Sequence, residues 1–149
     1  MLNRETCNNT VAAGFIATFV LTMTGFWQAG IGLPKMDVGA MLAGSMGQAY
    51  AWGVLAHFII GIILALMYVQ WFRAWLPGPD LLRGLIYGVI ACVAAALIVV
   101  PLATASTEMP AGVFFSNTDN AGGRIIGCLI MHVLYGISLG IAYREPDQA

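Results

Sequence analysis

Charge is the scarcest property of this 149-residue sequence. Only 9% of its residues are Asp, Glu, Lys or Arg, whereas soluble domains carry roughly 25%. The formal net charge is −1, which excludes the strongly basic surface that nucleic-acid binding requires. We therefore expect almost no soluble part and no nucleic-acid partner.

Motifs of known chemistry are missing as well. The sequence has no Walker loop, no dinucleotide fingerprint, and neither an HExxH nor a GxSxG pattern. Its cysteines, Cys7, Cys92 and Cys128, form no CxxC pair and are odd in number, so they predict no disulfide framework. We interpret them as small apolar side chains. These absences predict a protein that is not an enzyme and has no catalytic residues.

What the sequence has in abundance is apolar length. Hydrophobic residues make up 60% of the chain. Charged residues are absent from four stretches, residues 6–34, 38–72, 84–107 and 125–143. A helix needs about 20 apolar residues to cross roughly 30 Å of hydrocarbon. We therefore predict one all-α membrane domain, residues 1–149, folded as a four-helix transmembrane bundle with spans near 11–26, 49–72, 82–100 and 122–143.

The second and fourth spans share a pattern that predicts an internal repeat. The matching residues are His57, Gly61 and Tyr68 in one span and His132, Gly136 and Tyr143 in the other. The bundle is therefore expected to consist of two repeated helical hairpins, at about residues 11–72 and 82–143. Between the first two spans, Asp37 is placed to cap a short amphipathic outer helix that ends near Met46.

Small residues recur at helical spacing along the spans. In lipid, such residues let helix backbones approach closely, and the van der Waals fit drives association. The helix-packing or interface residues predicted from this pattern are Gly53, Gly61, Gly84, Gly88, Gly136 and Gly140.

The only two histidines, His57 and His132, lie well inside their predicted spans. Polar groups at such depth usually face the bundle interior and often mark function. Imidazoles on related helices could ligate a b-type haem or copper. Alternatively, each ring bonds a carbonyl or hydroxyl of a neighbouring helix, for which Thr18, Thr22 and Thr24 are available.

Charges and methionines of the outer segments complete the list of candidates. Lys35, Asp37, Glu108 and Arg124 are expected to form ion pairs across the two outer loops. Met36, Met41 and Met46 follow one another at steps of five, which places successive side chains about 140° apart on a helix. Because they would not share a face, we interpret them as packing residues rather than as a copper site.

The distribution of basic residues predicts the orientation. Arg4, Arg73, Arg83 and Arg144 lie on one side of the predicted membrane, and Lys35 and Arg124 lie on the other. Since basic residues concentrate in cytoplasmic segments, both termini are expected in the cytoplasm.

Several loop and packing motifs resemble a known family. They are the stretch from Gly32 to Asp37, the stretch from His57 to Tyr68, Leu76-Pro-Gly-Pro79, and Val100-Pro101. The chain is similar in these motifs to small bacterial four-helix integral membrane proteins known only as a domain of unknown function. The resemblance implies the fold and a bacterial inner membrane, and it implies no catalytic residue.

Two functions are compatible with these observations. The first is a non-catalytic accessory subunit that packs on a larger membrane enzyme, such as a respiratory oxidase or a monooxygenase. Its partners would be other integral membrane subunits and lipids, or a second copy of the chain, and it would hold no cofactor. The alternative is a small membrane redox or metal carrier that binds haem or copper through His57 and His132.

Overall fold

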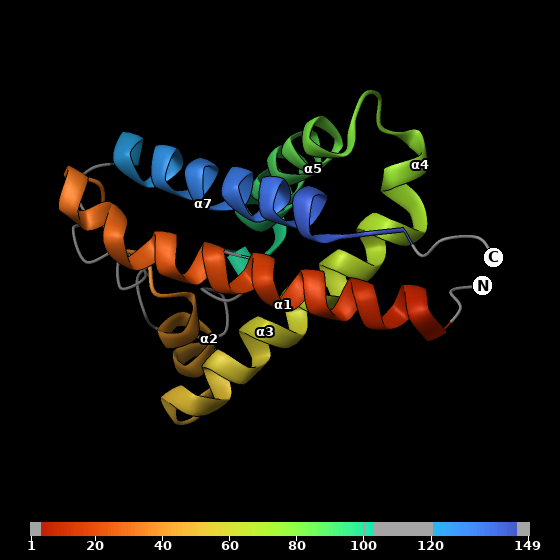
Figure 1. Ribbon diagram of the computed structural model, residues 1–149. Helices are drawn as coiled ribbons and strands as arrows, with labels where there is room; N and C mark the ends of the chain where they lie inside the picture. Colours follow the sequence, from red (N-terminus) through yellow and green to blue (C-terminus); the bar gives the residue numbers. More distant parts are fainter. Residues whose placement is uncertain (1–3, 100, 103–120, 146–149) are drawn as a thin grey trace.

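Four long helices dominate the computed structural model, which describes residues 4–99, 101–102 and 121–145. They are α1 (Arg4–Trp27), α3 (Tyr50–Met67), α5 (Asp80–Ala94) and α7 (Ala121–Ala142) (Figure 1). Each belongs to a helical segment long and apolar enough to cross a membrane. The described part of the chain contains no strand. The predicted all-α, four-helix membrane fold is therefore confirmed.

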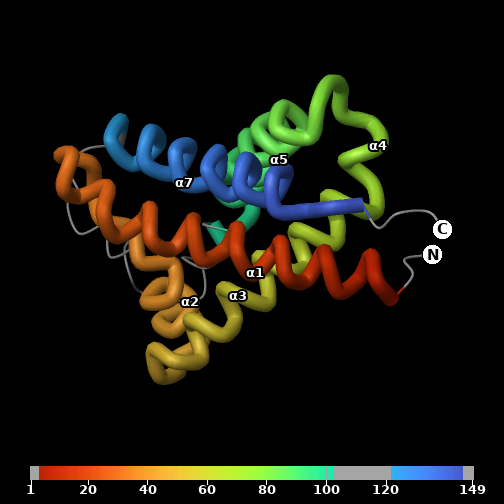
Figure 2. Tube along the Cα trace, in the orientation of Figure 1, coloured from red at the N-terminus to blue at the C-terminus, as the bar shows by residue number. Residues whose placement is uncertain are grey.

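Shorter elements join or extend these helices. They are η1 (Gln28–Ile31), α2 (Val38–Met46), η2 (Tyr68–Phe72), α4 (Arg73–Trp75) and η3 (Ala95–Val99). The tube drawing in Figure 2 shows α3 continuing through its extension into α4 before the chain turns back into α5. Gly78 supplies the positive φ of 89° at that turn, a conformation that glycine adopts without a steric penalty.

The first span begins earlier than the charge pattern predicted. We expected it near residue 11, but α1 starts at Arg4 and includes its polar first turns. Polar residues are compatible with a helix end that extends beyond the hydrocarbon. The side-chain amide of Asn9 donates to the carbonyl of Arg144 at 3.2 Å, so α1 begins where α7 ends.

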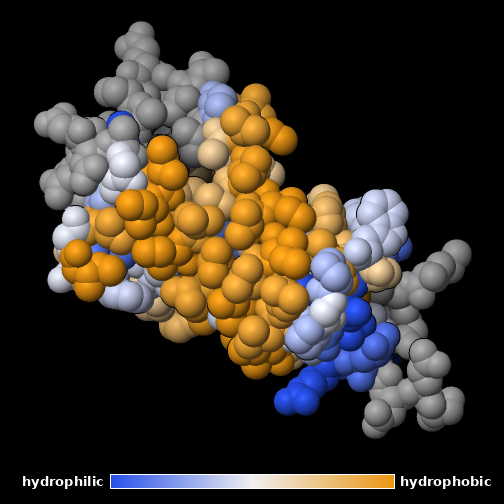
Figure 3. Space-filling view, turned by 90° about the horizontal axis from the view of Figure 1, so that it is seen from above, coloured by the Kyte–Doolittle hydropathy of each residue, from blue (hydrophilic) through white to orange (hydrophobic). Residues whose placement is uncertain are grey.

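The exterior of the molecule is apolar. Figure 3 shows hydrophobic residues covering most of the visible face, with hydrophilic residues gathered mainly at one end. Phe15, Ile59 and Ile126 illustrate this surface, since each is about half exposed. Large apolar side chains exposed in every span are typical of a protein whose solvent is lipid. The chain is a multi-pass membrane protein.

Contacts between α5 and α7 depend on glycine. A Cβ atom at Gly84 would overlap the carbonyl oxygen of Gly136, and one at Gly136 would overlap that of Gly84. Gly88 meets the carbonyl of His132 in the same way, and Gly140 meets that of Asp80. The two backbones therefore touch directly, which only glycine allows.

The first hairpin packs through two further glycines. Gly61 of α3 lies against the side chain of Thr18 on α1, and Gly53 of α3 lies against the backbone of Gly39 on α2. All six predicted packing glycines thus lie in contacts between helices of this chain.

Contacts among the long helices do not follow the two-fold pattern of the repeat. α1 packs closely on α7, but the backbones of the equivalent pair, α3 and α5, come close to each other at very few positions. Side-chain hydrogen bonds reach α3 from both helices of the second hairpin: the hydroxyl of Tyr87 on α5 donates to the carbonyl of Leu64, and the hydroxyl of Tyr135 on α7 donates to that of Gly61, both at 2.7 Å. α3 and α5 are therefore joined by side chains and not by close packing of their backbones.

The segment that returns from α1 to α2 is fixed in place. The amide of Met36 donates to the carbonyl of Gly25 at 2.9 Å, and Gln28 Nε2 donates to the carbonyl of Pro34 at 2.7 Å. Asp37 then accepts from the amide of Ala40 at 2.9 Å. The predicted N-cap of the short outer helix is therefore confirmed.

Charged residues cluster at the end where α7 finishes. Arg73 pairs with Asp80 at 3.2 Å and with Glu145 at 3.1 Å, and Arg83 pairs with Asp80 at 3.4 Å. The guanidinium of Arg73 also lies 5.1 Å from the ring centre of Tyr143. Burial raises the pKa of the Tyr143 phenol, so this ring stays neutral beside the arginine.

Candidate metal centre

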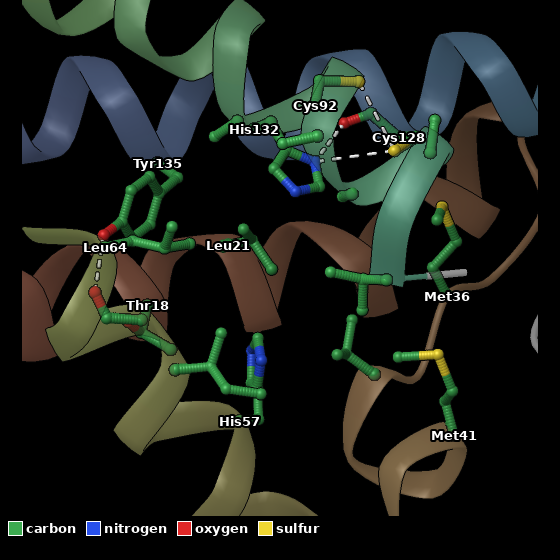
Figure 4. Close-up of a pocket in the computed structure, with 18 of the residues that line it drawn as sticks. Thr18, Leu21, Met36, Met41, His57, Leu64, Cys92, Cys128, His132 and Tyr135 are labelled. Atoms are coloured by element: carbon green, nitrogen blue, oxygen red, sulfur yellow. Dashed lines mark hydrogen bonds between the residues drawn. The ribbon is translucent and has the colours of Figure 1, made fainter. Parts of the chain in front are cut away.

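The bundle contains a cavity of about 460 Å³. This volume lies within the range of small-molecule sites. Most of its lining is apolar, and the residues come from both hairpins and from the α2 region. His57 and His132, which the sequence singled out, both line it (Figure 4). The structure thus brings the two histidines to one cavity.

The hydrogen bonds of His57 determine which ring nitrogen carries the proton. Its Nε2 lies 3.1 Å from the hydroxyl oxygen of Thr22. The single hydroxyl proton of Thr22 is donated to the carbonyl of Thr18 at 2.8 Å, so toward His57 the hydroxyl accepts. In the neutral ring Nε2 therefore holds the proton and Nδ1 keeps its lone pair. This confirms the predicted hydroxyl partner on a neighbouring helix.

His132 is fixed in the opposite tautomer. Its Nδ1 lies 2.8 Å from the carbonyl oxygen of Cys128, one turn earlier on α7. A carbonyl only accepts, so Nδ1 donates and the lone pair of the neutral ring lies on Nε2. The partner belongs to the same helix, whereas the sequence predicted one on a neighbouring helix. The ring nitrogen beside the thiols is therefore the protonated one, and it would have to give up this hydrogen bond and its proton to ligate an ion there.

Two free thiols complete the cluster on the same cavity wall. Cys92 Sγ on α5 lies 3.5 Å from Cys128 Sγ on α7, and Cys128 Sγ lies 3.6 Å from His132 Nδ1. One ligand atom from each of the three residues falls within 4.8 Å of the others.

This spacing suits a single metal ion. Two thiolates bound at about 2.3 Å in a tetrahedral site lie roughly 3.8 Å apart. The observed Sγ–Sγ distance of 3.5 Å needs little adjustment to reach that value. Thiolates and imidazole are the ligands that zinc and copper prefer.

We did not predict this cluster from the sequence, because we interpreted the cysteines as small apolar side chains. A signal was nevertheless present in two ridges spaced by four residues: Gly84, Gly88 and Cys92 on α5, and Cys128, His132, Gly136 and Gly140 on α7. In an antiparallel pair these ridges run in opposite order. Once the glycines are matched, Cys92 must fall opposite His132 and Cys128.

The predicted ion pairing of the outer loops needs correction. Within the described residues Lys35 and Asp37 do not pair, because the Asp37 carboxylate caps α2 and accepts from the hydroxyl of Tyr50 at 3.4 Å. The Lys35 ammonium instead lies 4.7 Å from the ring centre of Phe26. Arg124 lines the cavity. Glu108 lies outside the described residues, so its pairing with Arg124 stays a prediction.

The fold and the site together define a multi-pass α-helical membrane protein with a Cys-Cys-His cluster on an internal cavity. No family model matches the chain, and no curated protein or solved structure shows significant similarity to it.

Proposed function

We propose that this protein is a small membrane-embedded carrier that binds one thiophilic transition-metal ion through Cys92, Cys128 and His132. The observation that supports the proposal is the convergence of three ligand atoms within 4.8 Å on the wall of a cavity. This modifies the carrier hypothesis drawn from the sequence, in which His57 and His132 were the ligands.

The surroundings suit metal binding inside a bilayer. Each thiol that coordinates the ion loses its proton, so binding releases protons. Two thiolates would balance the charge of a divalent ion and would leave one negative charge with Cu(I). His132 Nδ1 is the ring nitrogen beside the thiols, so binding of an ion through it would replace the hydrogen bond to the Cys128 carbonyl. His57, on α3, is a second imidazole on the lining of the same cavity.

The test is a metal-binding measurement on the full chain in lipid nanodiscs under reducing conditions. Cu(I) is offered as its bicinchoninate complex, and Zn(II) is offered with a colorimetric chelator. We expect the wild type and the Cys7→Ser control to remove one ion per chain from at least one chelator. Cys92→Ser and Cys128→Ser should weaken binding by more than the roughly 100-fold that loss of a hydrogen-bond partner of a ligand costs. Equal binding by all four proteins would overturn the proposal.

Haem is a second candidate, favoured by two histidines on one apolar cavity. A visible spectrum of the purified protein separates the two ligands, because only haem gives a Soret band. If that band were present and were lost in His57→Ala, while the cysteine variants retained it, the haem carrier would replace the metal carrier.

The accessory-subunit role remains a further hypothesis. Its sequence argument relied on glycine ridges that would be free for neighbouring subunits, but these ridges are used within the chain. Its remaining support is the exposed apolar surface, which fits a partner helix as well as lipid. Purification in mild detergent, followed by identification of co-purifying membrane subunits, tests it. A metal-binding subunit could also satisfy both hypotheses.

A further inference from the structure

We infer that the ion carried is Cu(I) and that Met36 and Met41 form its access route from the end of the bundle opposite the termini. This inference depends on the proposed metal site. It is carried by the position of the two thioethers, because both methionines line the same cavity as Cys92, Cys128 and His132. In Figure 4, Met36 lies between Met41 and Cys128.

The helical spacing of the methionines argued against a shared role, but that argument assumed one continuous helix. α2 begins at Val38, after the Asp37 cap, so Met36 belongs to the preceding extended segment. Only Met41 and Met46 share a helix, and there the expected divergence holds. Met41 is 8% exposed and lines the cavity, whereas Met46 is 44% exposed.

The position of Met36 is held by several contacts rather than by a loose loop. Its amide is bonded to Gly25, and a Cβ at Gly25 would overlap the Met36 carbonyl oxygen. Gln28 holds the neighbouring Pro34, and Asp37 anchors the next turn. The side chain is 6% exposed, so its sulfur is presented to the cavity and not to lipid.

Sulfur chemistry then selects the ion. A neutral thioether is a soft ligand that binds Cu(I), whereas zinc sites in proteins are built from Cys, His, Asp and Glu. Two thioethers ahead of two thiols give Cu(I) a route of increasing affinity, because thiolate is the stronger ligand. Zn(II) gains nothing from the methionines on that route.

The test compares Met36→Leu/Met41→Leu with Met46→Leu as the matched control. Leucine conserves volume, so the double variant is expected to fold. In nanodiscs, stopped-flow transfer of Cu(I) from bicinchoninate should be about tenfold slower or more in the double variant, a loss comparable to other contributions from outside the ligand set. The final occupancy should equal that of the wild type. Zn(II) uptake, where it occurs, should proceed at the same rate in all three proteins.

A second measurement traps the ion before it reaches the thiols. In a Cys92→Ser/Cys128→Ser background, weak Cu(I) binding with sulfur ligands should persist by X-ray absorption and should vanish when Met36 and Met41 are also replaced. If the double methionine variant matched Met46→Leu in both measurements while the wild type bound Cu(I), the access route would be overturned and the metal site retained. If the wild type took up Zn(II) but no Cu(I), the identity of the ion would be overturned and the carrier retained. Absence of uptake of either ion would overturn both.

Discussion

At the scale of single residues, hydrogen bonds determine which ring nitrogen of His57 and of His132 carries the proton. Thr22 accepts from His57, and the Cys128 carbonyl accepts from His132, so each neutral ring is left with one lone pair. The Thr22 hydroxyl is itself bonded to the Thr18 carbonyl of its own helix, and the partner of His132 is a backbone carbonyl. The tautomer of His132 is therefore set by a partner one turn away on α7, and that of His57 by a partner on another helix, α1.

The proximity of the two thiols leads to a redox prediction. Mild oxidation with diamide should join Cys92 and Cys128, because their sulfur atoms are already 3.5 Å apart. Diamide takes up the two electrons and two protons that the thiols lose. The disulfide should abolish metal binding, and metal added beforehand should protect the thiols. Thiol titration and peptide mass spectrometry measure the outcome, with Cys7→Ser as the control. The prediction fails if both thiols remain titratable after oxidation.

At the scale of helices, glycine decides how the two hairpins close. α5 and α7 meet backbone to backbone along Gly84, Gly88, Gly136 and Gly140. α1 and α3 meet through Gly14, which faces Ala65 and the backbone of Ile62, and through Gly61, which faces the side chain of Thr18. The second helix of each hairpin carries a histidine and a glycine. The glycine contacts a threonine side chain in the first hairpin and a glycine backbone in the second.

The tight contact predicts a large effect from one methyl group. Gly136→Ala should destabilise the bundle by about 1–3 kcal/mol, the usual cost of overpacking, because the added carbon meets the backbone of Gly84. Gly30→Ala is the matched control, since a Cβ there has no neighbour within 4 Å. Unfolding in mixed micelles, followed by circular dichroism, gives both values. Equal stabilities would contradict the packing argument.

At the scale of the whole molecule, an even number of crossings brings the two ends of the chain together. α1 begins beside the end of α7, and the ion pairs of Arg73 and Arg83 lie at that same end. α2 lies at the opposite end (Figure 1). The metal route through Met36 and Met41 would therefore start on the side away from the termini.

Topology is the prediction that belongs to this scale. A reporter fused after Ala149 should lie in the cytoplasm, because the basic residues at that end outnumber those at the other. A reporter inserted at Gly47, in the turn after α2, should lie on the opposite side of the membrane. Finding both reporters on one side would contradict the crossings. If the Ala149 reporter lay outside and the Gly47 reporter in the cytoplasm, the four crossings would stand and the orientation would be overturned. The metal route would then start on the cytoplasmic side.

Much of the fold was determined by the sequence alone. The length of a charge-free stretch is a one-dimensional property, and lipid demands that each such stretch form a helix, so the four spans could be predicted. The Asp37 cap is equally local, since the carboxylate and the amide that it accepts from are three residues apart. The glycine ridges and the inward histidines follow from helical periodicity and from the cost of polar groups in lipid.

Only the tertiary structure decided which pairs of helices pack with their backbones close together. The repeat predicts equivalent hairpins, yet the backbones of α1 and α7 pack closely while those of α3 and α5 come close at very few positions. That difference depends on the simultaneous fit of several helices, which no single spacing contains. The same packing places Cys92 and Cys128 together on the wall of the cavity, although 36 residues separate them along the chain. The metal centre is therefore a product of packing, because its ligands come from helices that only the folded bundle brings into contact.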